Sequence, residues 1–279
     1  MIKLKTYPTQ SIKASDRILT FERPLVMGIL NVTPDSFFDG GKHEGINQAL
    51  SHTTKLIEEG VDIIDIGAYS SRPGAPLISA TEELNRALPI IKKLRELHPD
   101  TLLSIDTFRA EVAQRCVEAG VHIINDISGG TLDKQMFPAV AELQVPYILM
   151  HMRGKPETMQ QLTQYEDIVE DVGEALAKKI AALRELGVKD IMIDPGFGFA
   201  KTVEQSHELL YRIDELHYLG LPILGGISRK SMIYKKLDIT PSQSLTGTIA
   251  MNTLLLERGV HVLRVHDVKE AKQLIKLLY

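Results

Sequence analysis

Short, mostly apolar runs recur along the whole chain and alternate with longer stretches in which apolar and polar residues mix. Runs that are apolar at nearly every position indicate strands buried on both faces, as parallel sheets require. The pattern predicts strands at residues 24–30, 61–67, 101–106, 121–126, 145–151, 190–196, 221–228 and 260–267.

The segments between these runs carry apolar residues at intervals of three and four positions, which is typical of amphipathic helices. EVAQRCVEAG at 111–120 and EDIVEDVGEALAKKIAALRELG at 166–187 are examples. Several of these segments end in glycine just before the next strand, and glycine tolerates the left-handed conformation that stops a helix. The predicted helix-stopping residues are Gly60, Gly120, Gly187, Gly220 and Gly259.

Strands and helices that alternate at intervals of roughly 20 to 45 residues are typical of α/β folds with a parallel sheet. The count of eight strands favours an α/β (β/α)8 TIM barrel over residues 24–279, with a doubly wound sheet as the alternative. We expect residues 1–279 to form a single domain. Residues 1–23 are expected to form an N-terminal β-hairpin, with IKLKTY at 2–7 and RILTFE at 17–22 flanking a polar stretch. We expect it to cap the bottom of the barrel.

Composition narrows the class of protein. The chain has 279 residues, 44% of them hydrophobic, and a formal charge of −4 without a long basic run, so nucleic acid is not an expected partner. The single cysteine, Cys116, lies in a helical pattern and excludes a disulfide framework, which fits a cytoplasmic protein. The N-terminus has no signal-peptide core and no apolar stretch is long enough to span a membrane, so we expect a soluble protein without a membrane partner.

Polar residues stand where the predicted strands end. In a (β/α)8 barrel the active site lies at the carboxyl ends of the strands, so these residues are candidates for one site. They are Asn31, Ser70 to Gly74, Asp106, Asn125 and Asp126, Met150 and His151, Asp194 to Phe199, Ser228 to Ser231, and Arg264 to Asp267.

Each position also has a purely structural interpretation. Asp106 and Asp267 suit helix N-caps, and we keep that role for Asp267. Asp194 precedes a proline and suits an Asx-turn. Asn125 suits a satisfied buried amide, and Met150 suits core packing. The joint occurrence is harder to explain in this way, because a ring of buried polar groups is costly unless a ligand, water or metal lies at its centre.

The residue types indicate the kind of ligand. Asp106, Asn125 and Asp194 offer acceptors and donors for a flat heterocycle with amino and amide groups, and Met150 and Phe199 suit its faces. Arg264 and His266 lie two apart on one strand and so share a face, and Arg72 and Lys230 add positive charge. This set suits a phosphorylated substrate, although a satisfied salt-bridge network is the alternative.

In their order along the chain, these motifs make the sequence resemble the dihydropteroate synthase family. The motifs are GILNVTPDSFFDGG at 28–41, SSRPGA at 70–75, SIDTFR at 104–109, INDISGG at 124–130, LMHMRG at 149–154, DPGFGFAK at 194–201, SRKSM at 228–232 and RVHDV at 264–268. The resemblance runs from about residue 24 to the C-terminus.

The resemblance implies a (β/α)8 barrel enzyme, a transferase of a non-methyl alkyl group in folate biosynthesis and the target of sulfonamide inhibitors. It would condense 6-hydroxymethyl-7,8-dihydropterin pyrophosphate with p-aminobenzoate, giving 7,8-dihydropteroate and pyrophosphate. A homodimer is also implied, and SLTGTIAMNTLLLERG at 244–259 is a candidate contact surface. Three alternatives stay open: a pterin-dependent methyltransferase domain, a non-catalytic pteridine-binding protein and an unrelated phosphate-handling barrel enzyme.

The resemblance also implies a role for each site residue. Catalysis would depend on Asp106, Asp194, Lys230, Arg264 and His266. The pterin would be held by Asp106, Asn125, Met150, Asp194, Phe199 and Lys230. The pyrophosphate would be bound by Asn31, Ser71, Arg264 and His266, with Asn31 as a ligand of Mg²⁺. The p-aminobenzoate would be met by Asp35, Phe37, Arg72 and Pro73 on two loops that close over it, and by Ser228.

The chain departs from the family's usual motifs at three places. Ser71 stands where threonine is common, and its hydroxyl keeps the same hydrogen-bonding capacity. Tyr69 replaces small or acidic residues, and FFD at 37–39 replaces the commoner FSD. We expect the last two changes to affect loop packing or inhibitor fit.

Overall fold

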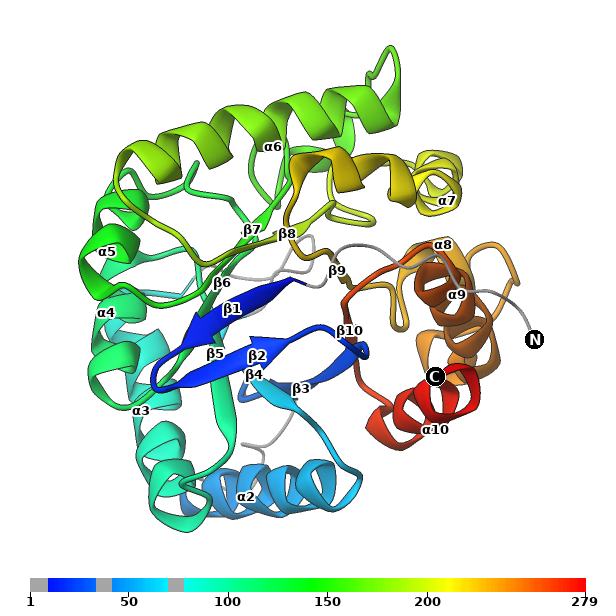
Figure 1. Cartoon of the computed structure of the whole chain (residues 1–279). Coiled ribbons are helices and arrows are strands. Elements are labelled where there is room, and N and C mark those ends of the chain that lie inside the picture. Colours follow the sequence, from blue (N-terminus) through cyan, green and yellow to red (C-terminus); the bar gives the residue numbers. More distant parts are fainter. Residues whose placement is uncertain (1–9, 34–41, 70–77) are drawn as a thin grey trace.

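Residues 10–33, 42–69 and 78–279 are described by the computed structural model of the chain. Parallel strands lie at its centre and helices surround them, which confirms the predicted barrel (Figure 1). The strands are β3 (Leu25–Asn31), β4 (Ile63–Gly67), β5 (Leu102–Asp106), β6 (Ile123–Asp126), β7 (Tyr147–Met150), β8 (Ile191–Asp194), β9 (Leu224–Gly225) and β10 (Val262–Val265). Each overlaps one of the predicted strands.

The strands pair in the order β8-β7-β6-β5-β4-β3-β10-β9, and every pair is parallel. A parallel bridge between Ile193 and Ile223 joins the two edges of this sheet, and the Ile193 N–H donates to the Pro222 carbonyl at 2.9 Å. The sheet therefore closes on itself, which rules out the doubly wound alternative.

Helices follow the strands and cover the outside of the barrel. They are α2 (Lys42–Glu58), α3 (Ala80–Leu97), α4 (Ala110–Glu118), α5 (Met136–Leu143), α6 (Ile168–Glu185), α7 (Val203–Tyr211), α8 (Ser231–Tyr234), α9 (Leu245–Glu257) and α10 (Val268–Leu278). Short 3-10 helices lie at η1 (Met159–Gln161), η2 (Ile213–Leu219) and η3 (Pro241–Gln243). The predicted helix-stopping glycines all adopt positive φ, at Gly60, Gly120, Gly187, Gly220 and Gly259.

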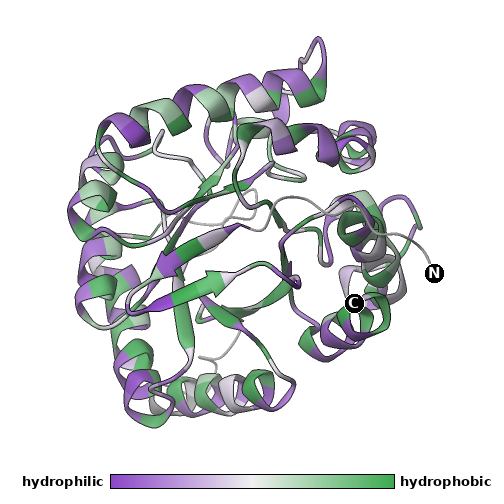
Figure 2. Ribbon diagram, viewed as in Figure 1, coloured by the Kyte–Doolittle hydropathy of each residue, from purple (hydrophilic) through white to green (hydrophobic). Residues whose placement is uncertain are grey.

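Side chains of alternating strand positions separate into two cores. One set points outward and packs under the helices, with residues such as Val26, Ile64, Leu103, Leu149 and Leu263. The other set points into the barrel and forms a closed apolar layer near the strand entrances. This inner layer contains Met27, Ile63, Leu102, Ile123, Ile148, Met192, Leu224 and Val262. In Figure 2 the barrel strands are mostly hydrophobic, whereas the helices around them mix hydrophilic and hydrophobic residues.

An antiparallel hairpin, β1 (Ser11–Ala14) and β2 (Arg17–Thr20), closes the bottom of the barrel. Ile12, Ala14 and Phe21 pack against the inner apolar layer, as the sequence predicts for a bottom cap. The expected first arm, residues 2–7, lies outside the described residues. The strand that pairs with β2 is β1, which falls in the stretch between the two expected arms. That stretch forms a strand because Ile12 and Ala14 alternate with exposed residues.

Over the described residues, none of the helices combines the length and the apolar character needed to cross a membrane.

The hairpin provides a direct test of the bottom layer. Ile12 is 3% exposed and Ile18, on the same hairpin, is 69% exposed. We expect Ile12→Ala to lower the free energy of unfolding by about 2–4 kcal/mol, because it removes buried methyl groups and leaves a cavity. Ile18→Ala, the matched control, should change it by less than about 0.5 kcal/mol. Urea unfolding measures both, and equal effects would contradict this packing.

Candidate active site

The interior of the barrel changes from apolar to polar at the next inward-facing position of each strand, just above the inner apolar layer. Side chains two positions further along each strand face the same interior, because strand side chains alternate with a period of two. This upper ring consists of Ile29, Asp65, Ser104, Asn125, Met150, Asp194, Gly226 and Arg264. Polar groups therefore gather at the carboxyl ends of the strands, as the sequence predicts.

Arg264 connects this ring across the barrel. Its Nε donates to Asp65 Oδ2 at 2.6 Å and its Nη2 donates to Asp106 Oδ2 at 2.7 Å. Asn125 Nδ2 donates to the same Asp65 oxygen at 2.9 Å. Asp65 is fully buried and the Arg264 side chain is 19% exposed. Arg264 therefore neutralises two carboxylates that come from neighbouring strands, and it remains partly open to the barrel mouth.

Asp194 at the end of β8 and Lys230 just before α8 form the next part of the site. Asp194 Oδ1 accepts a hydrogen bond from the Gly196 N–H at 2.7 Å, which is an Asx-turn as well as a site contact. Gly196 is required in this turn, because its φ is +71° and a Cβ would lie 2.1 Å from the His151 carbonyl oxygen. Lys230 Nζ donates to the Phe197 carbonyl at 2.8 Å and lies 4.8 Å from the centre of the Phe199 ring.

A buried lysine supports the loop that carries these contacts. Lys201 is 3% exposed, and its Nζ donates to the carbonyls of Gly196 and Phe199, each at 3.0 Å. Its third contact is His151 Nδ1, also at 3.0 Å. Ala200, just before it, has a φ of +50°, a conformation that costs an L-residue roughly 1 kcal/mol. The contacts of Lys201 offset this strain and fix the loop.

Apolar side chains line one side of the mouth. They form a cluster of Tyr69, Phe108, Ile127, Met150, Met152, Met159 and Ala200, against which Phe199 packs. Met150 is 2% exposed, whereas Phe199 is only half-buried. The polar ring thus has an apolar wall beside it, which suits a flat ligand with polar edges.

Ser228, His266 and Asn31 occupy the next level toward solvent. Ser228 Oγ lies 3.0 Å from His266 Nδ1 and accepts a hydrogen bond from the His266 N–H at 3.2 Å. Asn31 ends β3 beside Gly67, where an added Cβ would lie 3.1 Å from Asn31 Oδ1 and 4.0 Å from Asp106 Oδ2. These contacts bring the predicted residues of the first and last barrel strands to the same mouth as Asp106.

The electrostatics follow from burial and from these pairs. Burial raises the pKa of Asp106 and of Asp194, and the cations Arg264 and Lys230 oppose the rise. Burial lowers the pKa of Lys230 to about 8, although Asp194 opposes that shift. Burial also acts against the charge of Arg264, but Asp65 and Asp106 raise its pKa above the ordinary value. The site therefore combines a fixed cation with groups that can give or accept hydrogen bonds.

Comparisons with known proteins agree with this geometry. A family model described as pterin binding enzyme matches residues 27–266. The chain is 40% identical to the dihydropteroate synthase of Escherichia coli (strain K12) over 262 residues, which cover 93% of this chain and 92% of that relative.

The chain belongs to the dihydropteroate synthase family.

Solved structures of dihydropteroate synthases have the same fold. The enzyme of Xanthomonas albilineans with 4-aminobenzoic acid has a TM-score of 0.90 and 40% identity, covering 97% of each chain. The Yersinia pestis dihydropteroate synthase in complex with a sulfonamide drug has a TM-score of 0.89 and 39% identity, covering 96% of this chain and 97% of that one. These matches support the synthase and give no support to the methyltransferase or the non-catalytic binding protein.

Most of the residues assigned from the dihydropteroate synthase motifs meet at this mouth. They are Asn31, Asp106, Asn125, Met150, Asp194, Phe199, Ser228, Lys230, Arg264 and His266. Asp35, Phe37, Ser71, Arg72 and Pro73 lie outside the described residues, so their roles stay predictions. The N-cap role kept for Asp267 was wrong. Its side chain makes no cap hydrogen bond and pairs instead with Arg229, whose Nη2 lies 2.5 Å from Oδ1.

The sequence interpretation missed two buried charges that support the dihydropteroate synthase site. Asp65 lies in the middle of a predicted apolar strand. A carboxylate is rare in such a strand unless it is paired, so this residue could have indicated a buried ion pair. Lys201 lies in the motif DPGFGFAK, but no role was predicted for it. Its contacts are with backbone carbonyls and His151, which no spacing rule indicates.

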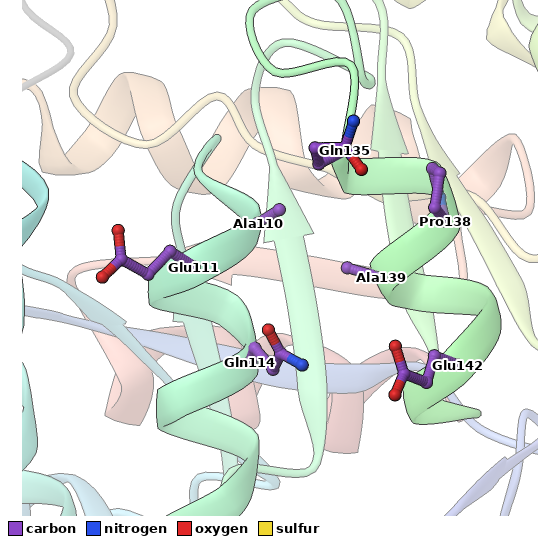
Figure 3. Close-up of a pocket in the computed structure, with 7 residues that line it drawn as sticks. All are labelled: Ala110, Glu111, Gln114, Gln135, Pro138, Ala139 and Glu142. Atoms are coloured by element: carbon purple, nitrogen blue, oxygen red, sulfur yellow. The ribbon is translucent and has the colours of Figure 1, made fainter.

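A surface groove between α4 and α5 lies away from this site. It has a volume of about 310 Å³ and is lined by Ala110, Glu111, Gln114, Gln135, Pro138, Ala139 and Glu142. Figure 3 shows these side chains on the two outer helices and at the start of α5. None of them belongs to the strand ends, so the groove is separate from the dihydropteroate synthase site.

Asp65 provides a test of the ion pairs that organise the mouth. We expect Asp65→Ala to lower the free energy of unfolding by about 2–3 kcal/mol, because Arg264 and Asn125 each lose a buried acceptor. Glu174→Ala breaks the exposed pair with Lys178 and should cost less than about 1 kcal/mol. Denaturant unfolding compares them, and an Asp65 variant as stable as the Glu174 variant would refute the assignment.

Proposed function

We propose that this chain condenses 6-hydroxymethyl-7,8-dihydropterin pyrophosphate with p-aminobenzoate and releases pyrophosphate. The observation that carries the proposal is the mouth itself, where Asp106, Asn125, Asp194 and Lys230 lie beside the apolar side chains of Met150 and Phe199. The membership in the dihydropteroate synthase family gives the reaction, and the geometry supports the division of the site that follows.

The pterin ring requires a set of acceptors and donors in one plane and apolar contacts on its faces. Asp106 and Asp194 keep acceptor capacity, because an ionised carboxylate has about four lone-pair sites. Lys230 supplies a donor. Its Nζ donates to the Phe197 carbonyl at 2.8 Å, and its charge interacts with Asp194 before any ligand binds. In the proposal, Met150 and Phe199, which belong to one apolar cluster, cover the faces of the ring.

The pyrophosphate half lies on the side of Arg264 and His266. Arg264 gives two of its N–H donors to Asp65 and Asp106, and a guanidinium has five, so donors remain for phosphate oxygens. Asn31 and His266 lie one level closer to solvent than Arg264. Ser71 is assigned to this half from the motif alone, as it lies outside the described residues.

The residues present fit Mg²⁺ that arrives with the pyrophosphate. Among the described residues, no group of three or more His, Cys, Asp or Glu side chains could hold a metal ion by itself. Mg²⁺ commonly keeps several waters and binds through one or two protein oxygens together with substrate phosphates. Asn31 Oδ1, which lies beside Gly67 at the mouth, provides such an oxygen. When bound, the ion would neutralise charge on the departing pyrophosphate.

The reaction proceeds by loss of pyrophosphate before the amine attacks. The C–O bond at the exocyclic methylene breaks, its electron pair leaves with the pyrophosphate, and the positive charge spreads into the pterin ring. Asp106 and Asp194 stabilise that charge by a preorganised negative field, while Arg264 and His266 stabilise the leaving oxygens. The arylamine nitrogen then bonds to the methylene carbon and gives up a proton to the solvent.

No covalent enzyme intermediate is needed in this mechanism. Cys116, the single cysteine of the chain, is buried in α4, and burial raises the pKa of its thiol to about 12. It therefore has no part in the reaction.

The p-aminobenzoate lies above the pterin, with Ser228 near its carboxylate. Asp35, Phe37, Arg72 and Pro73 complete this subsite in the proposal, on the ground of their motifs. Sulfonamides would compete for the same place, which is consistent with the drug complex of the Yersinia pestis relative. A homodimer and a cytoplasmic location complete the proposal, both on the ground of the family resemblance.

Two substitutions test the pterin assignment. Asp194→Ala and Lys230→Ala should each lower p-aminobenzoate-dependent pyrophosphate release by more than about 100-fold, because each removes a charged contact with the ring. A coupled pyrophosphate assay measures this loss. Lys178→Ala, on the exposed side of α6, is the matched control and should keep full activity. Turnover like that of the unaltered enzyme in both site variants would overturn the proposal.

Removing divalent cations tests the role given to Asn31. Excess EDTA should abolish turnover, and added Mg²⁺ should restore it. Asn31→Ala should need a several-fold higher Mg²⁺ concentration for half-maximal activity, because one protein oxygen is lost from the ion. Asn47→Ala, an exposed position on α2, controls for general effects of the substitution. Full activity in excess EDTA would remove the metal from the mechanism.

A further inference from the structure

Tyr69 forms a contact in the pterin site that the proposed function does not use. Its hydroxyl lies 3.2 Å from Asp106 Oδ1, and the side chain is 6% exposed. We infer that Tyr69 is a positioning residue, which holds the Asp106 carboxylate in the orientation that receives the pterin ring. This inference rests on the proposed function, because it takes Asp106 as a pterin contact.

The carboxylate of Asp106 is held from two sides. Tyr69 donates to Oδ1, and Arg264 Nη2 donates to Oδ2 at 2.7 Å. Two donors on different oxygens fix the plane of the carboxylate, which a single donor leaves free to rotate. The remaining lone pairs then have a defined direction for a ligand.

The phenol acts as a donor in this pair. Burial, followed by the charge of Asp106, raises the pKa of Tyr69 well above its ordinary value, so the hydroxyl keeps its proton. Among the described residues, the other charged groups around Asp106 are Asp65 on β4, Glu83 on α3, Arg264 on β10 and Lys230 before α8. Asp65 and Glu83 repel the Asp106 charge, and the hydrogen bond that Tyr69 donates to Oδ1 counteracts this repulsion.

The ring of Tyr69 is fixed independently of its hydroxyl. It packs edge-to-face on Phe108, with centroids 5.3 Å apart and an interplanar angle of 87°. The Arg109 guanidinium lies 4.5 Å from the centre of the Phe108 ring and forms an ion pair with the fully buried Glu83. Tyr69→Phe therefore removes the hydrogen bond and leaves the packing in place.

The variant should affect the pterin and spare the other substrate. We expect Tyr69→Phe to raise the KM for dihydropterin pyrophosphate about tenfold, the loss typical of a hydrogen bond to a charged group. The KM for p-aminobenzoate should stay within about twofold, since Asp106 does not contact that substrate in the proposal. The Kd of 6-hydroxymethylpterin, which lacks the pyrophosphate, should rise by a similar factor in a fluorescence titration, which separates ring recognition from chemistry.

Tyr147→Phe is the matched control. Tyr147 is also buried, and its hydroxyl donates to Asp126 Oδ2 at 2.7 Å, but it packs in the core under the helices. This variant should lose stability and keep both KM values. If Tyr69 had only a structural role, Tyr69→Phe would give the same result as this control. Thermal unfolding of both variants measures the structural part.

The outcomes separate the inference from the proposed function. If Tyr69→Phe leaves the KM for dihydropterin pyrophosphate and the Kd of 6-hydroxymethylpterin unchanged, the inference is wrong. The proposed function would still hold in that case, provided that the unaltered enzyme releases pyrophosphate in a p-aminobenzoate-dependent way. If the unaltered enzyme released no pyrophosphate but Tyr69→Phe still bound 6-hydroxymethylpterin more weakly, the positioning role would stand and the proposed reaction would fall.

Discussion

The contact of Arg264 with Asp65 and Asp106 is the interaction on which the site depends. Moving ionised groups away from water costs several kcal/mol for each ion, and the cost is recovered only when the charges pair with good geometry. Here one guanidinium pairs with carboxylates from two neighbouring strands, at 2.6 and 2.7 Å. The pairs let the barrel interior change from a closed apolar layer to a charged ring within one step along the strands.

This change from apolar to charged side chains determines which end of the barrel carries the candidate site. The apolar layer and the hairpin close the bottom of the barrel, so a ligand enters from the carboxyl ends of the strands alone. Above that layer, the charges are fixed before a ligand arrives, because Asp194 is held by the Gly196 N–H and Lys230 by the Phe197 carbonyl. A polar environment that needs no reorganisation stabilises developing charge better than water does.

A second set of residues holds the first in place without facing the ligand. Lys201 fixes the loop from Gly196 to Phe199 through two carbonyls, and so fixes the acceptor of Lys230. Tyr69 contacts Asp106, and the stack of Phe108 and Arg109 holds Tyr69. Such supporting contacts determine whether a binding group is held to within a fraction of an ångström.

The strands, the helix ends and the location of the site could be predicted from the sequence, which also favoured a barrel. Apolar runs, helix-stopping glycines and polar strand ends are local signals, and parallel strands bring their carboxyl ends to one side. The pairing of the charges could be established from the three-dimensional structure alone. Arg264 meets Asp65 from 199 positions away, because barrel closure and the stagger of the strands set their heights. The same holds for Asp267, which pairs with Arg229 instead of capping its helix, and for the first arm of the hairpin, whose pairing depends on the apolar layer that it covers.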